Sequence, residues 1–204
     1  RRDATIIYPG QTIRFMGRDI VFGSNSYSIS SDTGMSFRKF LSPWEEADCK
    51  GKEVNSNGDN ASNTLGTCLI RFADVLLMKA EALIWKNGEG DAEAKQLLNQ
   101  IRDRAGLPQN SQATKAQLMN ERRCELAFEF QPSRHIDVVR WGIATTTYAK
   151  PLYSVISKKV NGQIVAEEVE VYPGRTFNPT YNKVFPIPQR AFTGTVYLKQ
   201  NKGY

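Results

Sequence analysis

The feature that most constrains the fold is a pair of apolar repeats with helical spacing. The first repeat runs from Leu69 to Ile84 and the second from Ala94 to Ala105. In each, apolar residues recur three or four positions apart, as they do on one face of a helix. The segment between them contains two glycines, and Asp91 can cap the second helix. The pattern predicts an antiparallel αα-hairpin close in length to one tetratricopeptide repeat, which must stack on neighbours to bury its apolar faces.

Shorter elements are expected around this hairpin. Pro132 should end a third helix over 114–130, and a short helix follows over 134–141. Asn161-Gly162, between two strand-like runs, indicates a type I′ β-hairpin, whereas the proline-rich tail should be extended. The predicted fold is mostly α, with tetratricopeptide-like helix pairs, long irregular loops and a small β-hairpin. It divides into a loop-rich segment with short strands (1–66), a helical core (67–142), and the hairpin with its extended tail (143–204).

Composition excludes several classes of protein. The net charge is +6 over 204 residues, but the basic residues are not gathered in one arm, so nucleic-acid binding has little support. No apolar run approaches the roughly 18 residues needed to span a bilayer. Cys49, Cys68 and Cys124 lack metal-site spacing and are expected to be free thiols, with a Cys49–Cys68 pair as the alternative. Since the chain opens Arg1-Arg2-Asp3 without a signal core, we expect it to be the C-terminal part of a longer chain.

Three carboxylates share one face of the third predicted helix, because Glu121, Glu125 and Glu129 are spaced four residues apart. Such a group can supply the acid and base of a glycoside hydrolase. The structural alternative is an ion-pair network that attaches this helix to the hairpin, and it is favoured by the many arginines nearby. The candidate partners are Arg102, Arg104, Arg122, Arg134 and Arg140.

No other motif favours catalysis. His135 with Asp137 resembles a base and its orienting acid, but no serine or cysteine lies in an activating context. Phosphate-binding glycine loops and zinc-protease motifs are absent from the sequence. We therefore expect no enzyme activity, no cofactor and no metal.

Aromatic residues of the first segment are the candidate ligand-binding groups. Flat rings on loops can stack on sugars while neighbouring polar groups bond the hydroxyls. On loop placement alone, Trp44 and Tyr27 are the predicted carbohydrate-binding residues, although rings in this segment can equally pack the loops onto the helices. Trp141, beside two helical valines, is expected in the core. The candidate rings of this irregular segment are Phe22, Tyr27, Phe37, Phe40 and Trp44.

Eight segments along the chain form an ordered series of motifs: Asp3–Thr5, Phe37–Pro43, Leu69–Leu83, Leu98–Pro108, Glu121–Glu129, Asp137–Gly142, Phe185–Pro188 and Gln200–Tyr204. In this order they resemble the SusD-like (RagB/SusD) family of nutrient-binding outer-membrane lipoproteins of Bacteroidetes. One departure is local: the segment from Glu129 to Arg134 is longer than the family's usual Glu-Gly-x-Arg turn and contains a proline.

This resemblance implies an α-rich, non-catalytic protein whose loops bind glycans or oligosaccharides. It implies delivery of this cargo to a SusC-like TonB-dependent transporter, and a place on the bacterial outer-membrane surface through an N-terminal lipid anchor outside residues 1–204. No binding residue carries over, since the matching motifs resemble scaffold. The αα-hairpin by itself also fits another class, a helical-repeat scaffold that binds a protein or peptide.

Overall fold

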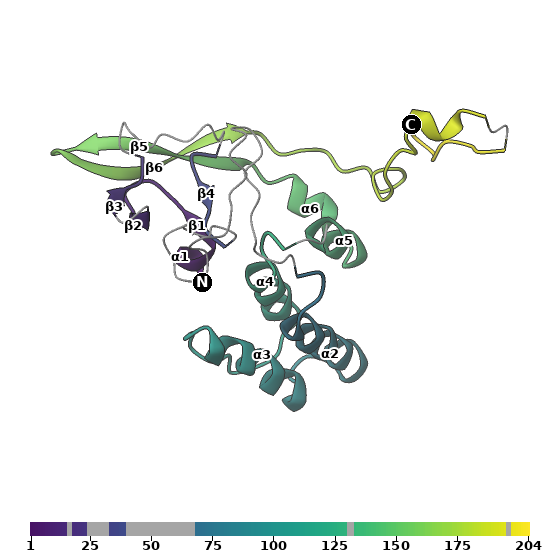
Figure 1. Ribbon diagram of the computed structural model, residues 1–204. Coiled ribbons are helices and arrows are strands. Elements are labelled where there is room, and N and C mark those ends of the chain that lie inside the picture. The colour runs from purple at the N-terminus through teal and green to yellow at the C-terminus, as the bar shows by residue number, and fades with distance from the viewer. Residues whose placement is uncertain (16–17, 24–32, 40–67, 130–132, 195–196) are drawn as a thin grey trace, which may run out of the picture.

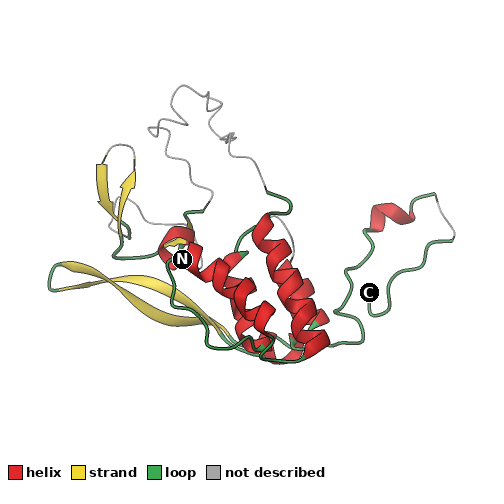
Figure 2. Ribbon diagram, turned by 90° about the horizontal axis from the view of Figure 1, so that it is seen from below, coloured by secondary structure: helices red, strands yellow, loops and turns green. Residues whose placement is uncertain are grey.

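The structure is a computed structural model that describes residues 1–15, 18–23, 33–39, 68–129, 133–194 and 197–204. Helices α2 to α6 form the body of the molecule, with the hairpin β5–β6 on one side and the C-terminal residues projecting on the other (Figure 1). The N-terminal end of the chain lies between this hairpin and the helices in both views (Figure 1, Figure 2). The expected mostly α fold with a small β-hairpin is confirmed.

The predicted αα-hairpin is present as α2 (Phe72–Asn87) and α3 (Ala92–Arg104). The Asp91 side chain accepts a hydrogen bond from the Ala94 N–H at 2.8 Å, which confirms it as the cap of α3. The apolar faces of both helices pack with α4 into the largest core cluster, in which Leu77, Leu98 and Leu118 are completely buried. No helix in the described ranges is long and apolar enough to span a membrane.

Helix α4 (Lys115–Glu125) begins at a capping box between Thr114 and Gln117 but ends before the expected position 130. Phe128 has a φ of 62°, a left-handed conformation that cannot continue a helix. Two carbonyls at this end, those of Glu125 and Ala127, accept hydrogen bonds from the ammonium of Lys39. Lys39 of the first segment thus binds carbonyls at this position, and α4 ends there. Sequence periodicity does not reveal a contact between such distant parts of the chain.

Helices α5 (Ser133–Arg140) and α6 (Ala144–Tyr148) form a second, smaller cluster with the tail, centred on Val138 and Phe177. Trp141 is not part of this core. Its ring is only partly buried, its Nε1–H donates to the Glu81 carboxylate at 2.8 Å, and the Arg140 guanidinium lies over it. The expectation of a core tryptophan was wrong, because the indole N–H has its partner at the edge of α2.

The first segment contains short elements, as expected: α1 (Arg2–Thr5), β1 (Ile6–Ile7), β2 (Thr12–Phe15), β3 (Arg18–Val21) and β4 (Ser36–Phe37). Strand β1 pairs with β4, and β2 pairs with β3, both antiparallel. Ile7, Ile13 and Phe22 bury a small cluster of their own. The predicted surface loop over 51–63 lies outside the described residues.

The long antiparallel hairpin joins β5 (Leu152–Val160) to β6 (Gln163–Tyr172). Asn161 and Gly162 both have positive φ, as a type I′ turn requires, so this prediction is confirmed. The first segment approaches the hairpin through Gly34, where an added Cβ would lie 1.8 Å from the Val155 carbonyl oxygen. Beside it, the Val155 N–H donates to the Thr33 carbonyl at 2.9 Å. Glycine is required at position 34 for this backbone contact.

The tail is extended and irregular, as predicted, and ends in a folded lobe. We call residues 183–194 and 197–204 the C-terminal lobe; it includes the short 3₁₀ helix η1 (Gln189–Phe192). The Gln200 side chain both accepts from the Ile187 N–H (2.8 Å) and donates to the Ile187 carbonyl (2.9 Å). Tyr204 Oη also donates to the Val184 carbonyl at 3.0 Å. These bonds close the chain into a loop of defined shape.

One face of α2 remains apolar and exposed. Phe72, Val75, Met78 and Trp85 lie on it at helical spacing, and Phe72 is 67% exposed. The opposite face of the same helix carries the core residues Leu77 and Ile84. Helix α2 is therefore apolar on two sides, of which only one is covered in the described structure.

This exposed face predicts how residues 1–204 behave when expressed alone. They should bind a hydrophobic dye such as ANS and associate with one another, because large contiguous apolar patches favour both. Val75→Gln together with Met78→Gln should reduce the dye fluorescence, whereas the exposed change Lys79→Gln should not. A monomer without dye binding, seen by fluorescence and light scattering, would contradict this prediction.

Candidate functional site

A cavity of about 570 Å³ lies where the first segment meets helix α4 and the ends of α2 and α3. Six of its eleven lining residues are charged: the basic ones come from the first segment, the start of α2 and the end of α3, and the acidic ones from the end of α4 and the residues after it. The lining residues are Arg1, Ala4, Thr5, Lys39, Cys68, Arg71, Arg104, Ala105, Cys124, Glu125 and Glu129.

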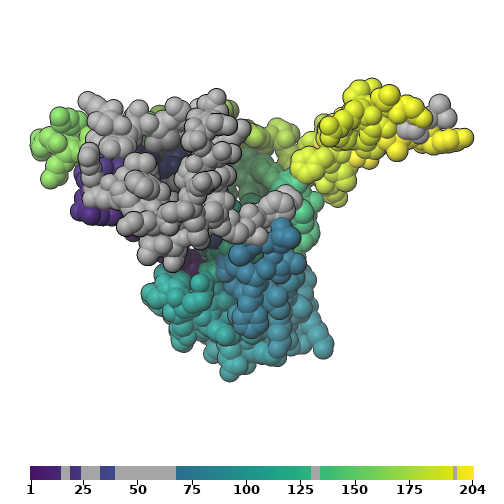
Figure 3. Space-filling model, viewed as in Figure 1, coloured from purple at the N-terminus to yellow at the C-terminus, as the bar shows by residue number. Residues whose placement is uncertain are grey.

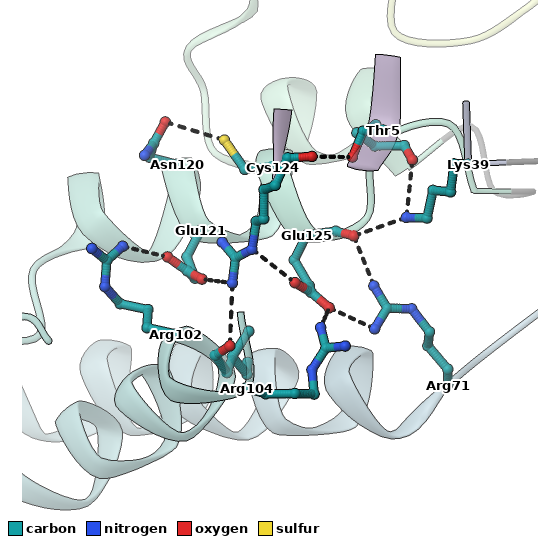
Figure 4. Close-up of polar contacts among 12 residues, drawn as sticks. Thr5, Lys39, Arg71, Arg102, Arg104, Asn120, Glu121, Cys124 and Glu125 are labelled. Carbon is teal, nitrogen blue, oxygen red and sulfur yellow. Dashed lines mark hydrogen bonds and ion pairs between the residues drawn. The ribbon is translucent and has the colours of Figure 1, made fainter. Parts of the chain in front are cut away.

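Helix α4 directs Glu121 and Glu125 toward this region, one turn apart (Figure 4). Glu125 is buried and its carboxylate binds three arginines: Arg71 Nη1 at 2.6 Å, Arg1 Nε at 3.1 Å, and Arg104. Glu121 is 1% exposed and binds Arg102 Nη1 at 2.9 Å as well as Arg1. Both carboxylates are thus compensated by cations from three separate stretches of chain.

Glu129 completes the acidic row beyond the end of the helix. It accepts from Arg71 Nε at 2.8 Å and is also paired with Lys39. Burial disfavours the charged carboxylate, but the hydrogen bonds from Arg71 and Lys39 outweigh it, so the pKa of Glu129 lies below its usual value. Burial also disfavours the charged form of Arg71, but its hydrogen bonds to Glu129 and Glu125 outweigh this effect, so the pKa of Arg71 lies above its usual value. Both groups therefore remain charged.

Helix α4 also contributes to a second buried ion-pair group, together with α2 and α5. Arg122 donates from Nε to Asp137 of α5 at 2.7 Å and is also bonded to Asp74 of α2. All three side chains are buried. Arg140 extends the group by binding both Asp137 and Glu81. Burial disfavours the charged form of Glu81, but the hydrogen bonds from Arg140 and Trp141 outweigh it, so the pKa of Glu81 is lowered. Charge therefore connects α4 to α2 and α5 as well as to the first segment.

The expectation of an arginine network around the three glutamates is confirmed, but only two of the five predicted partners bind them, and Arg134 forms no ion pair with a residue that the structure describes. Arg102 and Arg104 are partners of the glutamates, whereas Arg122 and Arg140 bind the aspartates and Glu81 instead. On a helical wheel Arg122 lies about 100° around α4 from Glu121, and its guanidinium reaches Asp74 of α2 and Asp137 of α5. Arg1, Lys39 and Arg71 were missed, since they come from segments whose approach to α4 has no sequence signal.

This arrangement does not support acid–base chemistry at the glutamates. A general acid needs a raised pKa, but the pKa of Glu129 is lowered, and Glu121 and Glu125 are each bound by at least two arginines. His135 does not pair with Asp137 either. Its Nδ1 lies 2.8 Å from Tyr148 Oη, while Asp137 is bound by Arg122 and Arg140. The charged residues that line the pocket are paired with one another, and these ion pairs hold its walls together.

The pocket also contains two cysteine thiols. Cys68 is exposed, Cys124 is partly buried, and both are free thiols that line the pocket; Cys49 lies outside the described residues. Across the described ranges, no group of three or more histidine, cysteine, aspartate or glutamate side chains is placed to hold a metal ion.

The predicted carbohydrate-binding residues Trp44 and Tyr27 lie outside the described residues, as does Phe40. Two others of the five candidate rings, Phe22 and Phe37, are described. Phe22 is buried with Ile7 and Ile13, and Phe37 packs edge-on against Phe128 with ring centroids 4.7 Å apart. Phe22 thus packs within the first segment itself, whereas Phe37 attaches the segment to the residues that follow α4, as the alternative interpretation of these rings predicted.

The fold defines a class of protein: an α-helical scaffold in which an antiparallel helix pair, a third helix and a long β-hairpin are joined by buried ion pairs. The model of the SusD family matches residues 1–204, that is, the whole chain. The chain belongs to the SusD family, as the resemblance of its motifs indicated.

Individual relatives agree with this assignment. A SusD-like protein of Bacteroides ovatus is 29% identical over 119 residues, which is 57% of this chain and 21% of that protein. A crystal structure of a SusD superfamily protein from Parabacteroides distasonis shares the fold with a TM-score of 0.52 at 24% identity, over 90% of this chain and 36% of its own. Another crystal structure matches with a TM-score of 0.54 at 18% identity, over 80% and 32%. The chain thus spans about a fifth of the curated relative and about a third of the solved structures.

Removing one charge from the pocket tests the structural role of the network. Glu125→Gln should lower the free energy of unfolding by about 3–5 kcal/mol, because arginines are left without a buried counter-charge. The matched control Glu93→Gln breaks the exposed pair with Lys79 and should cost no more than about 1 kcal/mol. Denaturant unfolding measures both; equal effects of the two substitutions would contradict a buried network.

The lowered pKa of Glu129 predicts a pH dependence. A carboxylate with a lowered pKa in the folded state stabilises the fold above its unfolded pKa of about 4.3, and this contribution is lost as pH falls further. Glu129→Gln should therefore be less stable than the wild type at pH 7, and the difference should shrink below about pH 4.3. Melting temperatures from pH 7 to pH 3 measure this; a gap that stays constant over the range would refute it.

Proposed function

We propose that the protein containing this chain is a non-catalytic, cell-surface binder of glycans or oligosaccharides, which it delivers to a TonB-dependent outer-membrane transporter. The observation that carries the proposal is membership of the SusD family over residues 1–204. The proposal includes a lipid anchor in sequence beyond these residues. We assign the described residues a scaffold role, in which helices and ion pairs position loops that bind the ligand.

The state of the acidic residues supports binding rather than turnover. Glu121, Glu125 and Glu129 are held in ion pairs, and the pKa of Glu129 is lowered rather than raised. A glycosidase requires one carboxyl group that remains protonated near neutral pH. Incubation of the complete gene product with each bound oligosaccharide, followed by product analysis, tests this part; any hydrolysis removes the non-catalytic assignment.

Glycan binding itself is tested on the complete gene product, including any sequence beyond residues 1–204. A glycan array followed by calorimetry should identify an oligosaccharide that binds. Trp44→Ala should then weaken binding by several-fold to roughly a hundredfold, by analogy with the stacking of aromatic rings on nucleic-acid bases, and leave the melting temperature unchanged.

Trp141→Ala is the matched control for this ring. It removes the hydrogen bond to Glu81 and should lower stability without changing the affinity for the glycan. Wild-type affinity in Trp44→Ala would take Trp44 out of the binding site.

A second candidate function is a helical-repeat scaffold for a protein or peptide, and one observation favours it, the exposed apolar face of α2. Helical repeats commonly bind partners through such surfaces. The two functions predict different behaviour of the complete gene product. The scaffold function would be favoured if the complete gene product bound no arrayed glycan and still bound the dye at the α2 face, so that Val75→Gln with Met78→Gln reduced its fluorescence.

A further inference from the structure

In the last part of the chain every charged side chain is basic. From Pro173 to Tyr204 the sequence contains Arg175, Lys183, Arg190, Lys199 and Lys202 but no aspartate or glutamate. In the rest of the chain acidic residues accompany the basic ones. This stretch therefore has a charge character of its own.

The four cations of the C-terminal lobe are available to a ligand. Lys183, Arg190, Lys199 and Lys202 are all exposed. None of them forms an ion pair with any residue that the structure describes. The lobe projects from the body of the molecule (Figure 3), which separates these charges from the acidic side chains of α4. Its field is consequently positive on the exposed surface.

Exposed rings lie among these charges. Phe185 is 70% exposed and Tyr197 is 91% exposed, and each is two residues from a lysine in the sequence, Lys183 and Lys199 respectively. The loop that presents them is fixed by the two bonds between Gln200 and Ile187 and by the Tyr204 bond to Val184. A surface that combines exposed rings with cations suits a ligand with flat apolar faces and negative groups.

We propose that the C-terminal lobe binds acidic polysaccharide, meaning a glycan that carries carboxylate or sulfate groups. The proposal rests on the glycan-binding function above and narrows its substrate class. Sugar faces stack on Phe185 and Tyr197, and the lysines and Arg190 pair with the acidic groups. Anionic lipid is the less suitable occupant, because the only helix of the lobe is the four-residue η1 and it forms no amphipathic surface for a membrane.

The test uses the complete gene product and three probes: polygalacturonate as the acidic polysaccharide, soluble starch as the neutral one, and vesicles containing phosphatidylglycerol. Polygalacturonate should bind more tightly than starch, and its binding should weaken as salt rises from 50 to 500 mM, roughly as the screening length falls. Lys199→Gln with Lys202→Gln should weaken polygalacturonate binding roughly two- to thirtyfold, as expected for two exposed charge contacts. Tyr197→Ala should weaken it independently of salt.

The control is Lys79→Gln with Lys86→Gln on α2, which removes the same charge from an exposed helix and should leave binding unchanged. Unchanged polygalacturonate affinity in the Lys199/Lys202 variant, or equal loss in the control, overturns the proposal. If the Lys199/Lys202 variant loses binding to the vesicles but not to polygalacturonate, the proposal is also overturned and the lobe is assigned to lipid. If starch binds and polygalacturonate binds no better, the glycan-binding function stands and the acidic specificity fails; if no glycan binds, both fail.

Discussion

Helix α4 is held by buried charge on two faces, and the arrangement of the described chain depends on it. On one face Glu125 brings together Arg1, Arg71 and Arg104. On the other, Arg122 links α4 to α2 and α5 through two aspartates. A buried charge without its partner costs several kcal/mol. Moving any of these segments away from α4 would therefore leave a charge on another segment unpaired or exposed. The segments are therefore coupled to one another through this single helix.

The apolar core and the ion pairs contribute differently to this structure. Leu77, Leu98 and Leu118 provide close packing between three helices, but the hydrophobic effect has no direction and distinguishes poorly between neighbouring registers. Hydrogen-bonded charges do have direction. The guanidinium of Arg71 meets Glu125 and Glu129 at once, and such an arrangement exists at one relative position of α2 and α4 only. Packing supplies stability, and the charges select the register.

Sequence patterns identified what is local and missed what is distant. The α2–α3 hairpin, the Asp91 cap and the Asn161-Gly162 turn follow from spacing and backbone preference over a few residues, and all three are present. Family motifs identified the fold, which the family match confirms.

The early end of α4 and the hydrogen bond of Trp141 to Glu81 were not predictable, since each depends on a partner far away in the sequence. The same holds for the candidate site: the glutamates were recognised by their spacing, but Arg1 and Lys39 reach them through tertiary contacts alone.

The contact between Gly34 and the β5–β6 hairpin has a consequence for biosynthesis. Thr33 and Val155, joined by a backbone hydrogen bond, are separated by most of the helical core. At a ribosomal speed of about 5–20 residues per second, the partner strand is made roughly 6 to 24 seconds after the first segment. Ile7, Ile13 and Phe22 lie close enough in sequence to cluster during that time. Within residues 1–204, the first segment is thus synthesised well before the strand whose Val155 N–H bonds to Thr33.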